Sequence, residues 1–68
     1  MSVQVTVNGQ PREVPADTTV GQVVATVSEL ATGIAAAVNG EVVPRRSWPA
    51  TLLRNGDRVE VVTAVQGG

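Results

Sequence analysis

The fold of this chain is decided first by residues 3–14, which read VQVTVNGQPREV. The valines at the start of this stretch alternate with polar residues, which is the pattern of a strand with one buried face. The pair Asn8-Gly9 follows and favours a type I′ turn, because both central residues of that turn need a positive φ. The return strand, residues 10–14, contains Pro11, which has no N–H to donate and therefore belongs on an edge strand. The stretch predicts a β-hairpin.

A helix is expected directly after this hairpin. Thr19 and Gln22 have the spacing of a capping box, in which each side chain binds the other's backbone N–H, and Asp17 adds negative charge near the helix N-terminus. Apolar residues then recur on one helical face: Val20, Val23, Val24, Val27 and Leu30. Gly33 is a natural helix stop, so we expect the helix to span about Val20 to Ala31. Valine is a mediocre helix former, so packing must hold this helix.

The second half of the chain predicts three further strands. Residues 34–38 are a short apolar run, typical of a strand that packs on both faces. A second Asn-Gly turn leads into a short strand over residues 41–43, which Pro44 ends. Residues 45–53 read as irregular, with Ser47 as a candidate cap for a short turn. A third turn at Asn55-Gly56-Asp57 precedes the last strand, which we expect to span Arg58 to Val65 with Val59 and Val61 on one face and Glu60 and Val62 on the other.

This order of elements predicts an α+β fold in which a mixed four- to five-stranded sheet packs on one helix. Its 68 residues make one small domain. We expect that domain over residues 1–65, followed by a flexible diglycine tail over residues 66–68.

The composition argues against an enzyme, a metal protein and a nucleic-acid-binding protein. Cys and His are absent, so the chain has no disulfide, no thiol nucleophile and no imidazole to serve as base or metal ligand. We find no carboxylate pair, Ser-His arrangement or phosphate loop, and expect no bound metal. The net charge is −1, and the five basic residues are scattered arginines. A nucleic-acid interface needs a basic stripe, so none is expected.

The termini carry two further expectations. The N-terminal residues lack the basic region and long apolar run of a signal peptide, and no apolar stretch approaches membrane-spanning length. We therefore expect a soluble cytoplasmic protein. The sequence stops at Gly67-Gly68. Glycine has no Cβ, so such a tail can enter a narrow channel and deliver a carboxylate there. The alternative is a flexible terminus whose two glycines are incidental.

The chain resembles the ThiS family, the bacterial sulfur carriers of thiamine (thiazole) biosynthesis, which are ubiquitin-like β-grasp proteins. Three stretches carry the resemblance: AVNGEVVPRRSW at residues 37–48, LRNGDRVEVV at 53–62, and AVQGG at 64–68. The Asn-Gly-x-Val-Val-Pro-Arg-x-x-Trp run joined to Gly-Asp and a terminal diglycine is fairly specific. The resemblance covers essentially the whole chain.

The resemblance implies that this protein is a co-substrate with no catalysis and no bound cofactor of its own. An E1-like (ThiF-like) adenylating enzyme, using ATP and magnesium, would adenylate the Gly68 carboxylate. A sulfur donor enzyme would then supply the sulfur that gives a thiocarboxylate on Gly68, and a ThiG-like thiazole synthase would take that sulfur into the thiazole ring. Gln66 and Gly67 would form the tail that enters the enzyme's channel.

Four other residues are candidates for a partner surface. Val62 either belongs to an exposed docking patch on the open sheet face or packs as part of a half-buried strand. Trp48 either contacts a partner, as tryptophan often does, or covers one end of the valine core. Arg45 and Arg46 either pair with acidic groups on the adenylating enzyme or remain solvated.

Two alternative functions stay open on the sequence alone. The first is a β-grasp sulfur carrier for another pathway, such as molybdopterin or cysteine. The second is a non-catalytic interaction module in which the diglycine is incidental.

Overall fold

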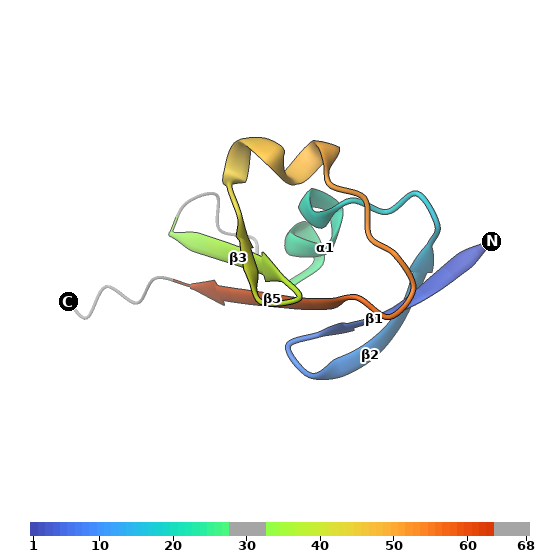
Figure 1. Ribbon diagram of the computed structural model, residues 1–68. Helices are drawn as coiled ribbons and strands as arrows, with labels where there is room; N and C mark the ends of the chain where they lie inside the picture. Colours follow the sequence, from blue (N-terminus) through green and yellow to red (C-terminus); the bar gives the residue numbers. More distant parts are fainter. Residues whose placement is uncertain (28–32, 64–68) are drawn as a thin grey trace.

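A mixed five-stranded sheet packed on one α-helix forms the body of the protein (Figure 1). The computed structural model describes residues 1–27 and 33–63. The strands are β1 (Ser2–Val7), β2 (Gln10–Pro15), β3 (Ile34–Val38), β4 (Glu41–Val43) and β5 (Arg58–Thr63); the helices are α1 (Val20–Val27) and the 3₁₀-helix η1 (Arg45–Ala50). The predicted packing of a mixed sheet on one helix is confirmed. The 3₁₀-helix η1 was not predicted.

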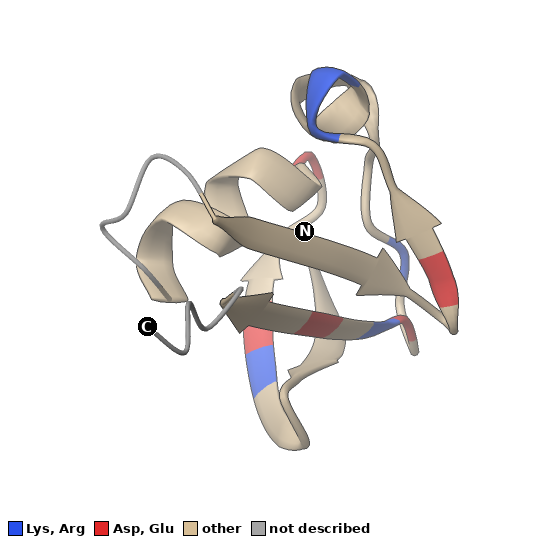
Figure 2. Cartoon of the chain, turned by 90° about the vertical axis from the view of Figure 1, so that its left-hand side faces the viewer, with Lys and Arg blue, Asp and Glu red and all other residues tan. Residues whose placement is uncertain are grey.

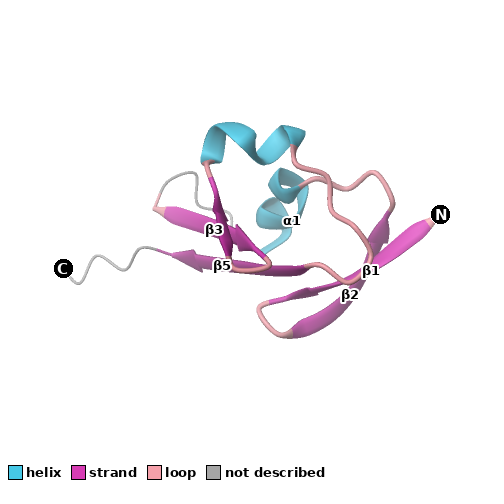
Figure 3. Ribbon diagram, viewed as in Figure 1, coloured by secondary structure: helices cyan, strands magenta, loops and turns pink. Residues whose placement is uncertain are grey.

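The first and last strands lie side by side in the middle of the sheet. The strand order is β2-β1-β5-β3-β4, and β1 runs parallel to β5 while the other neighbours are antiparallel. Both hairpins, β1–β2 and β3–β4, therefore flank β5 (Figure 3). The placement of β2 at one edge confirms the prediction made from Pro11.

Two type I′ turns close the hairpins, as their Asn-Gly pairs predict. Asn8 and Gly9 have φ values of 51° and 83°, and Asn39 and Gly40 have 53° and 87°. These values lie in the left-handed region, which asparagine and glycine tolerate better than other residues. The two turns thus fix the register of both hairpins.

The capping box at the start of α1 is present. The Thr19 backbone N–H donates to Gln22 Oε1 at 2.9 Å, and the Gln22 backbone N–H donates to Thr19 Oγ1 at 3.2 Å. The predicted extension of the helix to Ala31 lies outside the described residues, while Gly33 has the positive φ (74°) expected after a helix. The reciprocal bonds satisfy two backbone donors that the first turn would otherwise leave unpaired.

The core is a valine layer between α1 and one face of the sheet. Its fully buried members come from α1, the three central strands and the segment after β4: Val5, Val7, Val20, Val23, Val24, Ala36, Trp48, Leu53, Val59 and Val61. The expectation that Val59 and Val61 face the helix is confirmed.

The prediction that residues 34–38 pack on both faces is wrong. Ala36 is buried against the core, but Ala35 is exposed, and no helix within residues 1–27 and 33–63 covers the face to which it belongs. The run reads as wholly apolar because alanine, not a polar residue, occupies the open face. Alanine is small enough to be exposed at little cost, so the alternation that marks a one-sided strand is hidden.

The segment after β4 is a short 3₁₀-helix, η1, whereas the sequence indicates irregular structure there. The helix begins after Pro44, and no side-chain hydrogen bond caps it, so the cap expected at Ser47 is absent. Its Trp48 side chain turns into the core and donates from Nε1 to the Val43 carbonyl oxygen at 2.9 Å. A buried indole with a satisfied N–H is the arrangement that tryptophan needs in a core, and it holds η1 over α1.

Gly21 lies where α1 passes η1, and alanine is expected to be accommodated there. A Cβ at this position would lie 3.5 Å from Trp48 Cβ, which is an ordinary van der Waals contact. Glycine costs a helix roughly 0.5–1 kcal/mol relative to alanine. We expect Gly21→Ala to stabilise the fold by about 0.5 kcal/mol, because the residue stands near the helix start. Urea unfolding measures this, and Gly9→Ala, at a φ of 83°, is the control expected to destabilise. If Gly21→Ala were less stable than the unmodified chain, the contact between position 21 and Trp48 would be too close for a methyl group.

Candidate functional site

The candidate tail follows β5, the central strand of the sheet. The last described residue of that strand, Thr63, pairs with Ile34 of β3. Gln66, Gly67 and Gly68, the residues of the predicted tail, lie outside the described residues. What the structure establishes is the strand before the tail. β5 pairs with β3 over residues 59–63 and with β1 at Arg58 and Val59. Among the described residues, the end of β5 next to the tail therefore pairs with β3.

The open face of the sheet carries an apolar patch beside this root. Cross-strand pairing puts Val42, Ala37 and Glu60 in one row, and Ala35 and Val62 in the next. Val42 is 74% exposed and Val62 is 58% exposed. The expectation that Glu60 and Val62 lie opposite the core is confirmed, and of the two alternatives for Val62 the structure supports exposure. We call Ala35, Ala37, Val42 and Val62 the open-face patch.

The open-face patch is hollow, because its two alanines are shorter than the valines beside them. The hollow has a volume of about 140 Å³ and is lined by the open-face patch together with Ala36 and Glu60. Figure 2 shows β3 without any charged residue, beside basic and acidic positions on β5. A concave apolar surface with one carboxylate at its side can receive an apolar side chain of a partner protein.

The structure does not bring the other predicted surface residues onto this face. Arg45, Arg46 and Trp48 belong to η1, which packs with α1 on the opposite side of the sheet (Figure 1). Trp48 is only 7% exposed, so it covers the core and offers little surface to a partner. The Arg45 guanidinium lies 5.4 Å from the centre of the Trp48 ring, a distance within the range of a cation–π contact. Partner binding by the two arginines stays a prediction.

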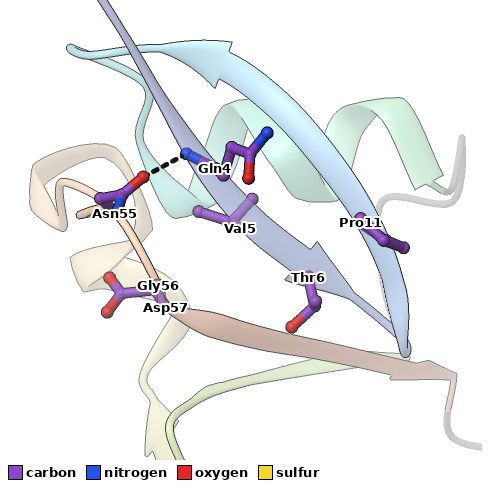
Figure 4. A pocket seen from close by; sticks show the side chains of 7 residues that line it. All are labelled: Gln4, Val5, Thr6, Pro11, Asn55, Gly56 and Asp57. Atoms are coloured by element: carbon purple, nitrogen blue, oxygen red, sulfur yellow. Dashed lines mark hydrogen bonds between the residues drawn. The ribbon is translucent and has the colours of Figure 1, made fainter.

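A second hollow, of about 210 Å³, lies between β1 and the turn before β5 (Figure 4). Its one carboxylate belongs to Asp57, and both oxygens accept hydrogen bonds: Oδ2 from the Arg54 backbone N–H at 2.8 Å and Oδ1 from Asn39 Nδ2 at 3.0 Å. Asp57 is thus a turn-forming residue, as its place in the sequence predicts. A carboxylate held in this way shapes the turn.

The described part of the chain holds no recognisable catalytic or metal centre. No group of three His, Cys, Asp or Glu residues suited to a metal ion occurs within residues 1–27 and 33–63. Over the same residues, no helix is long and apolar enough to cross a membrane. The groove between β2 and α1 has a volume of about 320 Å³, and its lining combines apolar, hydroxyl, amide and charged residues: Arg12, Glu13, Val14, Pro15, Thr18, Gln22, Val23 and Thr26.

Comparison with known proteins decides the family. The sequence model of the ThiS family matches residues 5–68, which includes the diglycine. The chain belongs to the ThiS family. The match takes in both the open-face patch and the residues of the tail, so both lie within one family domain.

Two ThiS proteins illustrate the similarity. The sulfur carrier protein ThiS of Escherichia coli K12 is 27% identical over 66 residues, which cover 97% of this chain and 100% of the relative. The crystal structure of the thiamine biosynthesis protein ThiS from Geobacter metallireducens is 30% identical, with a TM-score of 0.76 over 97% of this chain and 100% of that one. The predicted β-grasp fold is confirmed by this structural match.

Three residues of the open-face patch are not indicated by the sequence: Ala35, Ala37 and Val42. Val42 lies in a three-residue strand, too short to show an alternation of apolar and polar residues. Ala35 and Ala37 lie within a run of apolar residues with no polar neighbour to mark a face. The hairpin turn at Asn39-Gly40 is a signal that pairs Ala37 with Val42, since a two-residue turn fixes which residues of the two strands stand opposite each other.

Proposed function

We propose that this chain is the sulfur carrier that supplies sulfur to the thiazole ring of thiamine. The observation that carries the proposal is the family match over residues 5–68, which extends through Gly67 and Gly68. The absence of Cys and His from the sequence is consistent with it, because a carrier needs no nucleophile or base of its own. On this proposal the protein is a co-substrate, and the chemistry belongs to its partner enzymes.

The reaction runs on the carboxylate of Gly68. One carboxylate oxygen attacks the α-phosphorus of ATP, bound with magnesium on the E1-like adenylating enzyme, and pyrophosphate leaves. The acyl-adenylate has a good leaving group, AMP, so sulfur that the donor enzyme delivers at the oxidation level of sulfide displaces it at the carbonyl carbon. The product is a thiocarboxylate, and thiazole synthase transfers its sulfur onward. Adenylation thus activates a weak electrophile without any side chain of the carrier.

The glycines suit this chemistry because they have no side chain. A tail that reaches a nucleotide site must pass between walls close enough to exclude water, and the lack of Cβ atoms at Gly67 and Gly68 lets the backbone fit. β5, the central strand of the sheet, precedes this tail in the chain. A partner can therefore bind the folded body and react with the C-terminal carboxylate.

The open-face patch is the surface that we assign to the adenylating enzyme. Exposed valines around a hollow favour burial against a partner, since apolar area removed from water contributes about 25 cal/mol per Å². The patch also lies on β5, so a partner bound there is placed beside the root of the tail. Docking at the patch would therefore direct the tail into the nucleotide site.

Changing Val62 to Asp is expected to weaken docking without unfolding the chain. Val62 is 58% exposed, so the carboxylate costs the free protein little, but it would be desolvated in the complex. We expect the concentration needed for half-maximal adenylation to rise roughly tenfold or more, equivalent to about 1.4 kcal/mol, with an unchanged rate at saturation. Pyrophosphate release over a range of carrier concentrations measures both.

The chain offers a matched control for this variant. Leu52 is also 58% exposed, but it lies after η1 and pairs with Thr19 at the start of α1, away from the open-face patch. Leu52→Asp adds the same charge at the same exposure and is expected to leave adenylation unchanged. Equal effects of the two substitutions would refute the assignment of the patch.

The function itself is tested by the intact mass of the carrier. The protein is incubated with the adenylating enzyme, ATP, magnesium and a sulfur donor, and a gain equal to the exchange of one oxygen for sulfur is expected. Addition of thiazole synthase and its small-molecule substrates should return the original mass. A thiocarboxylate that thiazole synthase does not consume would overturn the thiazole assignment, and no mass gain with an active adenylating enzyme would overturn the carrier role.

A further inference from the structure

Asn-Gly pairs occur three times in this chain, at 8–9, 39–40 and 55–56. Such pairs carry an intrinsic chemical liability. The backbone nitrogen of the glycine is unhindered, because glycine has no Cβ, and it can attack the side-chain carbonyl carbon of the asparagine before it. The three pairs are chemically alike in the unfolded chain, so any difference between them in the native protein comes from structure.

Asn8 and Asn39 are a nearly matched pair. Both occupy the first position of a two-residue type I′ turn, with φ values of 51° and 53°. In each, Oδ1 accepts a hydrogen bond from a backbone N–H of β5: from Val61 at 2.8 Å for Asn8, and from Arg58 at 2.9 Å for Asn39. A donor on Oδ1 stabilises the negative charge that this oxygen gains when the carbonyl carbon is attacked.

The two residues differ at the nitrogen that must leave. Asn39 Nδ2 donates to Asp57 Oδ1 at 3.0 Å, whereas Asn8 Nδ2 has no hydrogen-bond partner among the described residues. The Asp57 carboxylate holds the Asn39 amide in place, and its negative charge opposes both deprotonation of the Gly40 nitrogen and the charge forming on Oδ1. Asn8 has neither restraint.

The third pair is restrained at the attacking nitrogen. The Gly56 backbone N–H donates to the Gln4 carbonyl oxygen at 2.7 Å, and Asn55 Oδ1 accepts from the Gln4 backbone N–H at 2.8 Å (Figure 4). For Gly56 to attack, its N–H must give up this bond and its lone pair must turn toward the side chain. Gln4 of β1 therefore holds both reacting groups in hydrogen bonds.

We propose that Asn8 is a site of spontaneous deamidation in the folded protein, and that Asn39 and Asn55 are protected. Hydroxide removes the Gly9 amide proton, the nitrogen forms a bond to Cγ of Asn8, and the Cγ–Nδ2 bond breaks with release of ammonia. Water then opens the resulting succinimide at one of its two carbonyls, which leaves an aspartyl or an isoaspartyl residue at position 8. No oxidant or enzyme is needed.

The isoaspartyl product would disturb the contact between β1 and β5. Its backbone contains one additional methylene group, in a turn that has room for two residues. The Asn8 backbone N–H donates to the Val59 carbonyl oxygen at 2.9 Å, and its side chain accepts from Val61. Both contacts join the hairpin to β5, so the modification would loosen the strand that leads to the tail.

Peptide mapping of the native chain tests the proposal. The full-length protein is incubated at mildly alkaline pH, and the loss of each asparagine is followed by mass spectrometry, with isoaspartyl content read by enzymatic methylation. A parallel sample in denaturant supplies the intrinsic rate of each site. After normalisation to these rates, we expect Asn8 to react roughly tenfold faster than Asn39, the factor expected for one hydrogen bond to a charged group. Normalised rates that are equal, or higher at Asn39 or Asn55, would overturn the proposal.

Asp57→Ala is the matched variant. It removes the acceptor of Asn39 Nδ2 and leaves every contact of Asn8 in place, so the normalised rates of Asn39 and Asn8 should converge. The variant also loses the Arg54 contact, so its fraction folded is measured by circular dichroism under the same conditions. A folded variant in which Asn39 stays protected would show that Asp57 is not the cause, and would refute this explanation.

Discussion

Deletion of Gly68 is expected to abolish thiocarboxylate formation. One extended residue spans about 3.3–3.6 Å, so the deletion withdraws the carboxylate from the α-phosphorus of ATP by more than the length of a hydrogen bond. A misplacement of about 1 Å can lower a rate by roughly 100-fold. The remaining Gly67 carboxylate is chemically competent but out of reach, so we expect a loss of more than about 100-fold, measured as the fraction of chain that gains the mass of sulfur.

The deletion is interpreted with two companion variants. Gly67→Val keeps the length of the tail but adds a branched side chain, so a comparable loss would show that the channel is narrow as well as deep. Ala25→Glu alters an exposed position of α1 and should be converted like the unmodified chain. Conversion of the shortened chain at the normal rate would show that the length of the tail does not determine whether its carboxylate reacts. It would argue that the two terminal glycines are incidental.

The turns and the helix cap could be predicted because their causes are local. A type I′ turn needs two positive φ values, and Asn8-Gly9 and Asn39-Gly40 supply residues that tolerate them. The Thr19 and Gln22 capping box depends on one three-residue spacing. In each case the interacting groups are neighbours in the sequence, so no knowledge of the rest of the fold is required.

The helix η1 could not be predicted, and the open-face patch could be predicted only in part, because their causes are tertiary. η1 forms where Trp48 reaches the core and bonds to Val43, and nothing in residues 45–50 alone signals this. The patch depends on which side of β3 is covered, and its alanines are compatible with either side. On the sequence alone, Val62 therefore groups with Arg45, Arg46 and Trp48, from which the fold separates it.

The role of the tail could be predicted only from the resemblance to the ThiS family, and the reason is physical. Gly67 and Gly68 have no side chains, so they show no periodicity, charge or hydrogen-bonding pattern from which chemistry can be inferred. The two glycines act through the absence of side chains, and this absence matters only when the tail is bound by a partner enzyme. The fold adds the observation that the strand before the tail is the central one, bonded to β1 and β3.

Replacement of Trp48 with Ala is expected to remove a large part of the stability of the protein at room temperature. Domains have stabilities of about 0.05–0.15 kcal/mol per residue, which for this chain is about 3–10 kcal/mol. Loss of a buried tryptophan costs roughly 3–5 kcal/mol through lost burial and the cavity left behind. Trp48 is the only aromatic residue, and the surrounding valines branch at Cβ and have few rotamers with which to fill the space. Circular dichroism in urea measures the loss, since the variant has no indole fluorescence.

Trp48→Phe separates the two contributions of the indole. Phenylalanine restores most of the buried ring but cannot donate to the Val43 carbonyl, which then loses the partner it has at 2.9 Å. We expect a cost of about 1–3 kcal/mol, clearly less than for alanine. Leu52→Ala, at an exposed position, should change stability by no more than about 0.5 kcal/mol. If Trp48→Ala were as stable as Leu52→Ala, the core would not depend on η1. That helix would then be a surface loop, and its position over α1 would have to come from the backbone bonds around Thr51 alone.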